Sequence, residues 1–127
     1  MRTSIGMLAA AAAGVAFAAT AALAHHGWSW AEEEQSELTG VVRTVTIAPP
    51  HPSLQVETQG DGLWKIELGN PRQTQRAGFV EGSAKPGDEV VVLGNRSLDQ
   101  SEKRMKAVRI TVNGTVFDIY PDRIRMN

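Results

Sequence analysis

The 127-residue sequence contains no cysteine, so neither disulfide bonds nor thiolate chemistry contribute to its fold or activity. It also lacks an excess of positive charge, because 13 lysines and arginines stand against 14 aspartates and glutamates. A protein that binds a phosphate backbone usually clusters basic residues, so we expect no nucleic acid among its partners. No Gly-x-Ser-x-Gly motif, phosphate-binding loop or pair of carboxylates spaced across a cleft is recognisable. We therefore expect that the protein is not an enzyme.

Long hydrophobic runs are missing except at the start of the chain. There, Arg2 precedes an uncharged, mostly alanine segment from Ile5 to Leu23. This segment ends in Ala22-Leu23-Ala24, the small-x-small pattern of an export signal. A retained membrane anchor is the alternative, since the segment approaches the length of a membrane span, but alanine gains little from burial. We expect a signal peptide over residues 1–24, cleaved after Ala24, and a protein that is periplasmic or secreted with no stable membrane span.

The remaining 103 residues are enough for one small domain. Removal of residues 1–24 takes away one arginine and no acidic residue, which leaves a formal charge near −2. We expect an N-terminal arm over residues 25–36, a folded domain over 37–120 and a C-terminal tail over 121–127.

Hydrophobic and polar residues alternate over most of the mature chain, which predicts β-strands. Asn70-Pro71 predicts the N-cap and first residue of a short helix over 72–77, and Gly40 marks a bulge or bend in the first strand. The fold class expected from this order is mainly β, a small OB-like antiparallel β-barrel of five or six strands with one short helix between strands three and four. An open β-sandwich is the alternative. The expected strands are 37–47, 54–58, 63–68, 89–94, 104–112 and 115–120.

The mature chain also resembles an uncharacterised family of small exported bacterial proteins. The likeness lies in Ala24-His25-His26, Pro50-His51, the turn Lys85-Pro86-Gly87-Asp88, the basic strand Arg104-Met105-Lys106-Ala107-Val108-Arg109 and the segment Phe117-Asp118-Ile119-Tyr120-Pro121-Asp122-Arg123. The family often has an aromatic residue shortly after Pro-His, where this chain has Pro52 and Ser53, so an aromatic wall beside His51 is not expected here. The resemblance implies export and a shared fold, but it implies no activity.

The three histidines, His25, His26 and His51, are the candidate functional residues. Cleavage after Ala24 would give His25 a free α-amine beside its own imidazole, and these two nitrogens can close a chelate ring on one metal. An imidazole from His26 or His51 would complete the nitrogen set that copper(II) prefers, an arrangement called a histidine brace. We therefore predict a copper site at His25, His26 and His51 that serves carriage or buffering of the metal, with a metal ion and an envelope protein as candidate partners.

Other interpretations of these residues stay open. The two adjacent histidines are also typical of a polar tail, and the barrel is equally consistent with a non-metal ligand-binding or protein-interaction module of the periplasm. Trp28 and Trp30 lie on one face of their segment if it is extended. Such a pair is typical of an anchor for the arm, and the alternatives are a shield for a metal and a surface that stacks on a flat ligand. Residues 32–34, three glutamates, are most simply a solvated turn or short helix. The basic strand over 104–109 is more typical of a salt-bridged surface than of a nucleic-acid track.

Overall fold

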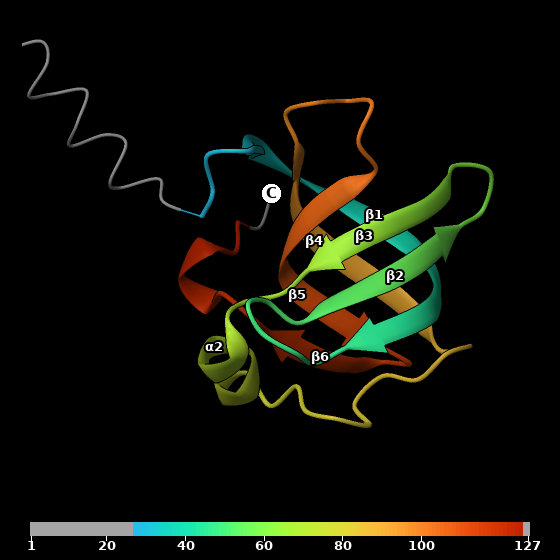
Figure 1. Ribbon diagram of the computed structural model, residues 1–127, viewed down its shortest axis with the longest axis vertical. Coiled ribbons are helices and arrows are strands. Elements are labelled where there is room, and N and C mark those ends of the chain that lie inside the picture. Colours follow the sequence, from blue (N-terminus) through green and yellow to red (C-terminus); the bar gives the residue numbers. More distant parts are fainter. Residues whose placement is uncertain (1–26, 126–127) are drawn as a thin grey trace, which may run out of the picture. The chain divides into compact units, whose positions relative to one another are not determined.

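The computed structural model describes residues 27–125 of the chain. Residues 27–30 form a turn, and the strands shown in Figure 1 follow it. No helix in this described part is long and apolar enough to cross a membrane. The elements are β1 (Ala31–Thr46), β2 (Ser53–Thr58), β3 (Gly62–Glu67), α2 (Pro71–Arg76), β4 (Glu89–Ser97), β5 (Arg104–Val112), β6 (Thr115–Asp118) and the 3-10 helix η1 (Pro121–Arg123).

The six strands form one sheet in the order β3-β2-β1-β4-β5-β6, and an additional pairing joins β3 to β5. The β3–β5 pairing is parallel, whereas all other neighbours are antiparallel. Because this pairing joins the third strand to the fifth, the first five strands close into a ring, and β6 extends the sheet beyond it. The expected OB-like barrel, with its helix between the third and fourth strands, is confirmed. The alternative of an open sandwich is wrong because the ring is closed.

β1 is longer than the sequence predicted, because it begins at Ala31 instead of Glu37. Residues 32–34, for which a turn or short helix was expected, lie in this strand. The side-chain amide of Asn95 on β4 donates hydrogen bonds to the carbonyl oxygens of Glu32 and Glu33, at 2.9 and 3.2 Å. Contacts with a distant strand thus hold residues 32–34 in an extended conformation, although the three glutamates show no hydrophobic periodicity of their own.

Gly40 lies where β1 passes from one neighbour to the next. Val41, which follows it, pairs with Glu57 on β2 and with Glu89 on β4. A Cβ at Gly40 would lie 2.4 Å from the carbonyl oxygen of Glu57, so only glycine allows β2 to approach this closely. The irregularity in the β1–β2 register falls two residues later, between Val42 and Thr44.

The predicted N-cap of the helix is confirmed, and residues with positive φ follow the helix and form the last hairpin turn. The side chain of Asn70 caps α2 by accepting a hydrogen bond from the backbone N–H of Gln73 at 2.8 Å, and Gly78 follows with φ of +88°. Asn113 and Gly114 both have positive φ, as a two-residue turn between β5 and β6 requires.

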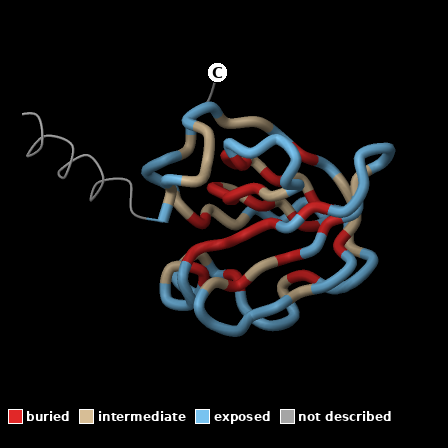
Figure 2. The backbone as a smooth tube through the Cα atoms, turned by 45° about the horizontal axis from the view of Figure 1, so that its top comes forward, coloured by how far each residue is buried: buried red, intermediate tan, exposed pale blue. Residues whose placement is uncertain are grey.

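The hydrophobic core fills the interior of the barrel, and Figure 2 shows the buried segments along the strands with exposed loops around them. Trp64 belongs to the core and is 5% exposed. Its indole N–H donates to the carboxylate of Asp61 at 3.3 Å. The largest fully buried side chains are Phe79, Leu54, Ile66, Leu68, Met105, Ile110 and Ile119.

A close approach at Gly94 on β4 gives a test of the barrel. A Cβ there would lie 2.2 Å from the carbonyl oxygen of Lys106 on β5, so we expect Gly94→Ala to lower the free energy of unfolding by about 2–3 kcal/mol. Gly60→Ala is the control, because a Cβ at Gly60 meets nothing within 4 Å and only the positive φ costs about 1 kcal/mol. Urea unfolding of the two variants measures the difference. Equal losses of stability would contradict the strand spacing.

Candidate functional site

Of the three histidines, the described residues contain only His51. His25 and His26 lie outside them, so the predicted set of three histidines stays a prediction. His51 lies half-buried in the loop between β1 and β2. The next residue, Pro52, accepts a hydrogen bond from the backbone N–H of Leu68 at 2.9 Å. This bond fastens the loop to the end of β3, where Glu67 is the last strand residue.

A buried row of polar side chains crosses the outer face of the barrel at this end. Lys106 on β5 pairs with Glu67 on β3 and with Asn95 on β4, so the three side chains point to the same face. Lys106 is only 2% exposed, Glu67 7% and Asn95 6%. The core residues Ile66 and Met105, each one position away, pair with one another and point to the interior. We call Glu67, Lys106 and Asn95 the polar row.

The C-terminal segment 119–125 covers part of this outer face. The backbone N–H groups of Ile119 and Tyr120 both donate to the carbonyl oxygen of Val108 on β5, at 2.9 and 3.1 Å. Further along, Gln35 on β1 donates to the carbonyl oxygen of Arg123 at 2.5 Å and accepts from the N–H of Arg125 at 3.1 Å. The Tyr120 ring lies over Lys106, with its centroid 5.8 Å from the ammonium nitrogen, which makes a cation–π contact.

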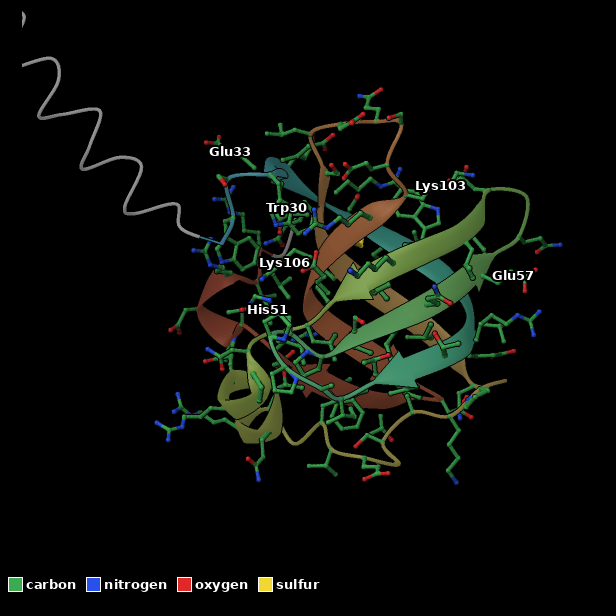
Figure 3. The ribbon with its side chains drawn as sticks, in the orientation of Figure 1. Trp30, Glu33, His51, Glu57, Lys103 and Lys106 are labelled. Carbon is green, nitrogen blue, oxygen red and sulfur yellow. The ribbon has the colours of Figure 1, made fainter. Side chains whose placement is uncertain are left out.

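Arg104 is the second cation of this end of the barrel. Its guanidinium forms an ion pair with the carboxylate of Glu67, and one of its terminal nitrogens lies 3.9 Å from Glu102. Lys106 and Arg104 belong to β5, and His51 belongs to the loop before β2. Glu67, at the end of β3, acts on both His51 and Lys106. Figure 3 shows His51 and Lys106 near the end of β3 that leads into α2. Glu57 and Lys103 lie toward the opposite end of the hairpin that β2 and β3 form. We call the following group the His51 cluster: His51, Glu67, Arg104, Lys106, Tyr120 and Arg123.

The members of the cluster change one another's protonation. Burial and then the charge of Lys106 lower the pKa of His51; Glu67 acts in the opposite direction and Arg104 in the same one. Burial is also the largest cause that lowers the pKa of Lys106, which Glu67 opposes and Arg104 and Arg123 reinforce. His51 is therefore predominantly a neutral imidazole at neutral pH, with a nitrogen lone pair that can bind a proton or a metal.

The pKa of the Tyr120 phenol is raised, chiefly by burial. The neighbouring Arg123 lowers it and Glu67 raises it. Tyr120 thus stays a neutral O–H donor over the physiological range of pH.

The structure revises the interpretation of the basic strand. Arg109 pairs with Asp118 at 2.6 Å and Arg104 with Glu67, so salt-bridging is confirmed for these two residues. Lys106, however, is buried rather than part of a solvated surface. The sequence pattern of β5 did not predict this burial. Both faces of the strand are buried from Met105 to Val108, whereas alternation of polar and apolar residues identifies only the face that packs on the core.

The expected arrangement of the two arm tryptophans is also revised. Trp28 and Trp30 lie in a turn, not in an extended segment, and both are half-buried. As for a metal, the described residues contain no group of three or more histidine, cysteine, aspartate or glutamate side chains that could hold one.

Strand order and closure thus define a small OB-like β-barrel with a polar cluster on the outside of one end. Residues 11–106 match the model of a family described as "Family of unknown function (DUF6152)". The match covers most of the chain, so the protein belongs to this family, as its resemblance to an uncharacterised family indicated. No curated protein matches the sequence.

Solved structures with a similar fold share little sequence with the chain. The ZRD-deleted mutant of TiaS in complex with agmatine is 18% identical with a TM-score of 0.53, over 72% of this chain and 28% of that one. The Stn1–Ten1 complex of S. pombe is 18% identical with a TM-score of 0.49, over 61% and 57%. The mitochondrial single-stranded DNA-binding protein Rim1 of S. cerevisiae is 13% identical with a TM-score of 0.49, over 62% and 92%. The chain thus spans less than two thirds of the TiaS and Stn1–Ten1 chains.

One expectation about partners needs correction. Net charge led us to expect no nucleic acid, yet the similar structures include a protein that binds single-stranded DNA. The exclusion was wrong because it rested on net charge, and a protein can bind a nucleic acid through a local surface whatever the charge of its whole chain. The fold also brings Arg104 and Arg123 close enough to Lys106 that both lower its pKa, which a count of charges does not reveal.

The protonation of His51 provides a test of the cluster. We expect its imidazole to titrate below the ordinary value of 6.5, and Lys106→Met to raise its pKa because a neighbouring positive charge is removed. Glu67→Gln should lower it further, since Glu67 favours the protonated form. Histidine NMR signals followed against pH, with His51→Gln for assignment, measure these shifts.

Arg109→Gln is the control for this titration, because Arg109 pairs with Asp118 on β6 and is not among the groups that act on His51. A wild-type pKa at or above 6.5, or one that neither cluster variant changes, would show that the cluster is not assembled as described.

Proposed function

We propose that the protein is an exported binding protein of the cell envelope, and that its ligand site is the end of the barrel that carries the His51 cluster. Export is supported by Arg2, the alanine-rich run and the Ala22-Leu23-Ala24 sequence. A role in binding rather than catalysis agrees with a sequence in which no nucleophile motif is recognisable.

The polar row is the observation that carries the proposal. Burial of charged or polar groups costs free energy unless every hydrogen-bonding atom is satisfied. Here the side-chain oxygen of Asn95 is buried and lacks a hydrogen-bond partner within the described part of the chain. The neighbouring Lys106 is buried, and burial lowers its pKa; Glu67 opposes this effect, whereas Arg104 and Arg123 reinforce it. A row that costs stability in this way is typical of a functional surface rather than of a structural core.

Replacement of Lys106 tests this without knowledge of the ligand. Methionine keeps most of the aliphatic side chain and removes the charge, while Glu67 keeps its pairing with Arg104. If Lys106 serves function at the expense of stability, Lys106→Met should raise the free energy of unfolding by about 0.5–2 kcal/mol. For a domain of this size, each 1 kcal/mol corresponds to a Tm shift of about 4–8 °C, which calorimetry resolves.

The matched control is Lys65→Met, because Lys65 is exposed on β3 and its replacement should change stability by less than about 0.5 kcal/mol. A clear loss of stability in Lys106→Met, with Lys65→Met unchanged, would make Lys106 a structural residue and contradict the proposal.

Copper binding through His25, His26 and His51 is a second candidate function. It is favoured by the lowered pKa of His51, because a neutral imidazole needs no deprotonation before it binds a metal. The charges of Lys106 and Arg104 act against it, since they also lower the stability of a cation at His51.

A titration with copper(II) tests this candidate on three proteins. They are the mature chain with a native His25 terminus, verified by mass spectrometry, the same chain with one extra N-terminal residue, and His51→Ala. A histidine brace predicts one-to-one binding that both changes weaken by about tenfold or more, a loss of at least 1.4 kcal/mol. Equally weak binding by all three proteins would remove copper from consideration.

A further inference from the structure

We infer that the barrel carries a second binding site, separate from the His51 cluster, whose ligand is a small aliphatic amine held by the carboxylate of Glu89. The site is a groove of about 550 Å³ on the outside of the barrel. No residue of the His51 cluster lines this groove. Glu57, which does line it, lies at the end of β2 away from His51 (Figure 3). The inference therefore does not rest on the proposed function.

The strand register builds the first row of the groove from outward-facing side chains. Val41 on β1 pairs with Glu57 of β2 on one side and with Glu89 of β4 on the other. Directly paired residues of neighbouring strands point to the same face of a sheet. The next pair along, Val42 with Val56, is buried in the core. The row before it therefore faces outward, with one carboxylate on either side of a valine.

The second row lies beside the first and is also apolar at its centre. Val91 on β4 pairs with Thr39 on β1 and with Thr111 on β5. Both valines, Val41 and Val91, are half-buried, so they form the floor of the groove, and residues of the turns after β2 and after β5 complete the lining. An apolar floor with a few polar groups, in a volume of about 300–1,000 Å³, is usual for a small-molecule site.

The charge of the groove favours a cation. Its lining contains two carboxylates, those of Glu57 and Glu89, and no lysine, arginine or histidine. Glu57 already forms an ion pair with Arg43, and because both side chains are about half exposed, this pair is nearly balanced in itself. Glu89 takes part in no ion pair within the described part of the chain. One negative charge is thus left unbalanced at the groove, and a ligand with one positive charge would neutralise it.

The turn after β5 fixes the position of Glu89. The backbone N–H of Glu89 donates to the side-chain oxygen of Asn113 at 3.1 Å, and its carbonyl oxygen accepts from the N–H of Asn113 at 3.0 Å. These bonds use only the backbone of Glu89 and leave its carboxylate at the edge of the apolar floor.

A primary ammonium group on an alkyl chain matches this arrangement. The ammonium group donates charge-assisted hydrogen bonds to the carboxylate, while the methylene groups cover the two valines and leave water. A metal ion matches it less well, because the described residues contain no group of three or more histidine, cysteine, aspartate or glutamate side chains that could hold one.

An NMR titration of the ¹⁵N-labelled mature chain at neutral pH and constant ionic strength tests the inference. The ligands are methylamine, ethylamine and n-butylamine, and sodium chloride is the baseline. The comparison ligands are 1-butanol, magnesium chloride and a lysine blocked at both its α-amine and its carboxyl group. We expect n-butylamine to give saturable shifts of the backbone signals of 39–41, 89–91 and 111–114. Affinity should rise with chain length, by up to about fourfold for each methylene group that is buried.

Three substitutions of exposed residues, which should leave the fold intact, locate the site. Glu89→Gln should weaken the binding of n-butylamine by about fivefold or more, because it removes the charge and keeps the shape. Arg43→Gln should strengthen it by up to about fivefold, since a nearby positive charge is lost. Glu81→Gln is the matched control, because Glu81 is exposed between α2 and β4 and does not line the groove. It should leave the binding unchanged.

Equal affinity for methylamine and n-butylamine, or the same shifts with magnesium, would overturn the inference, because the groove would then be a diffuse acidic surface. Binding of 1-butanol as tight as that of n-butylamine, or binding that Glu89→Gln does not weaken, would exclude Glu89 as the anchor. Tighter binding of the blocked lysine would contradict a free amine, since the ligand would then be a side chain of a partner protein. A titration without saturable shifts in the groove would rule out the site as a whole.

Discussion

The parallel pairing of β3 with β5 is the constraint on which the rest of the structure depends. It closes five strands into a barrel and sets Ile66 against Met105 inside. The same register sets Glu67 against Lys106 outside. One pairing therefore fixes both the core and the polar row, because successive residues of a strand point to opposite faces. A slip of β5 by one residue would turn Lys106 into the apolar interior and Met105 out of it, which explains why the register is strongly specified.

Most of the fold was predictable from the sequence because its signals are local. Alternation located the strands, and Asn70 and Pro71 located the helix. The start of β1 was not predictable from residues 32–34, because three adjacent glutamates have no period. They lie between the pairs that Ala31 and Gln35 form with β4, and the Asn95 side chain of β4 binds two of their carbonyl oxygens. Closure of the sheet was an expectation from the order of elements alone, since no local pattern encodes contact between the third and fifth strands.

The candidate site was much less predictable, because its parts meet only through long-range contacts. His51 stood out as one of three histidines, but the groups that act on it come from β3 and β5, and the segment after β6 contacts Lys106. The burial of Lys106 depends in part on the segment 119–125, which crosses the outer face of β5. A period-two pattern identifies the face that packs on the core, and it does not reveal that a second layer covers the other face. Net charge failed for the same reason, since it averages over residues that the fold gathers in one place.

A copper ion and the cations of the His51 cluster act against one another. A metal ion needs the neutral imidazole of His51, and every positive charge nearby weakens its binding. Lys106 and Arg104 help to lower the pKa of His51 and so keep its imidazole neutral, but the same two charges would repel a bound cation. The fold keeps Lys106 buried at the side of Glu67 in spite of two neighbouring arginines. Lys106 is therefore the residue that separates a copper site from any other role of this end of the barrel, because loss of its charge favours a cation at His51.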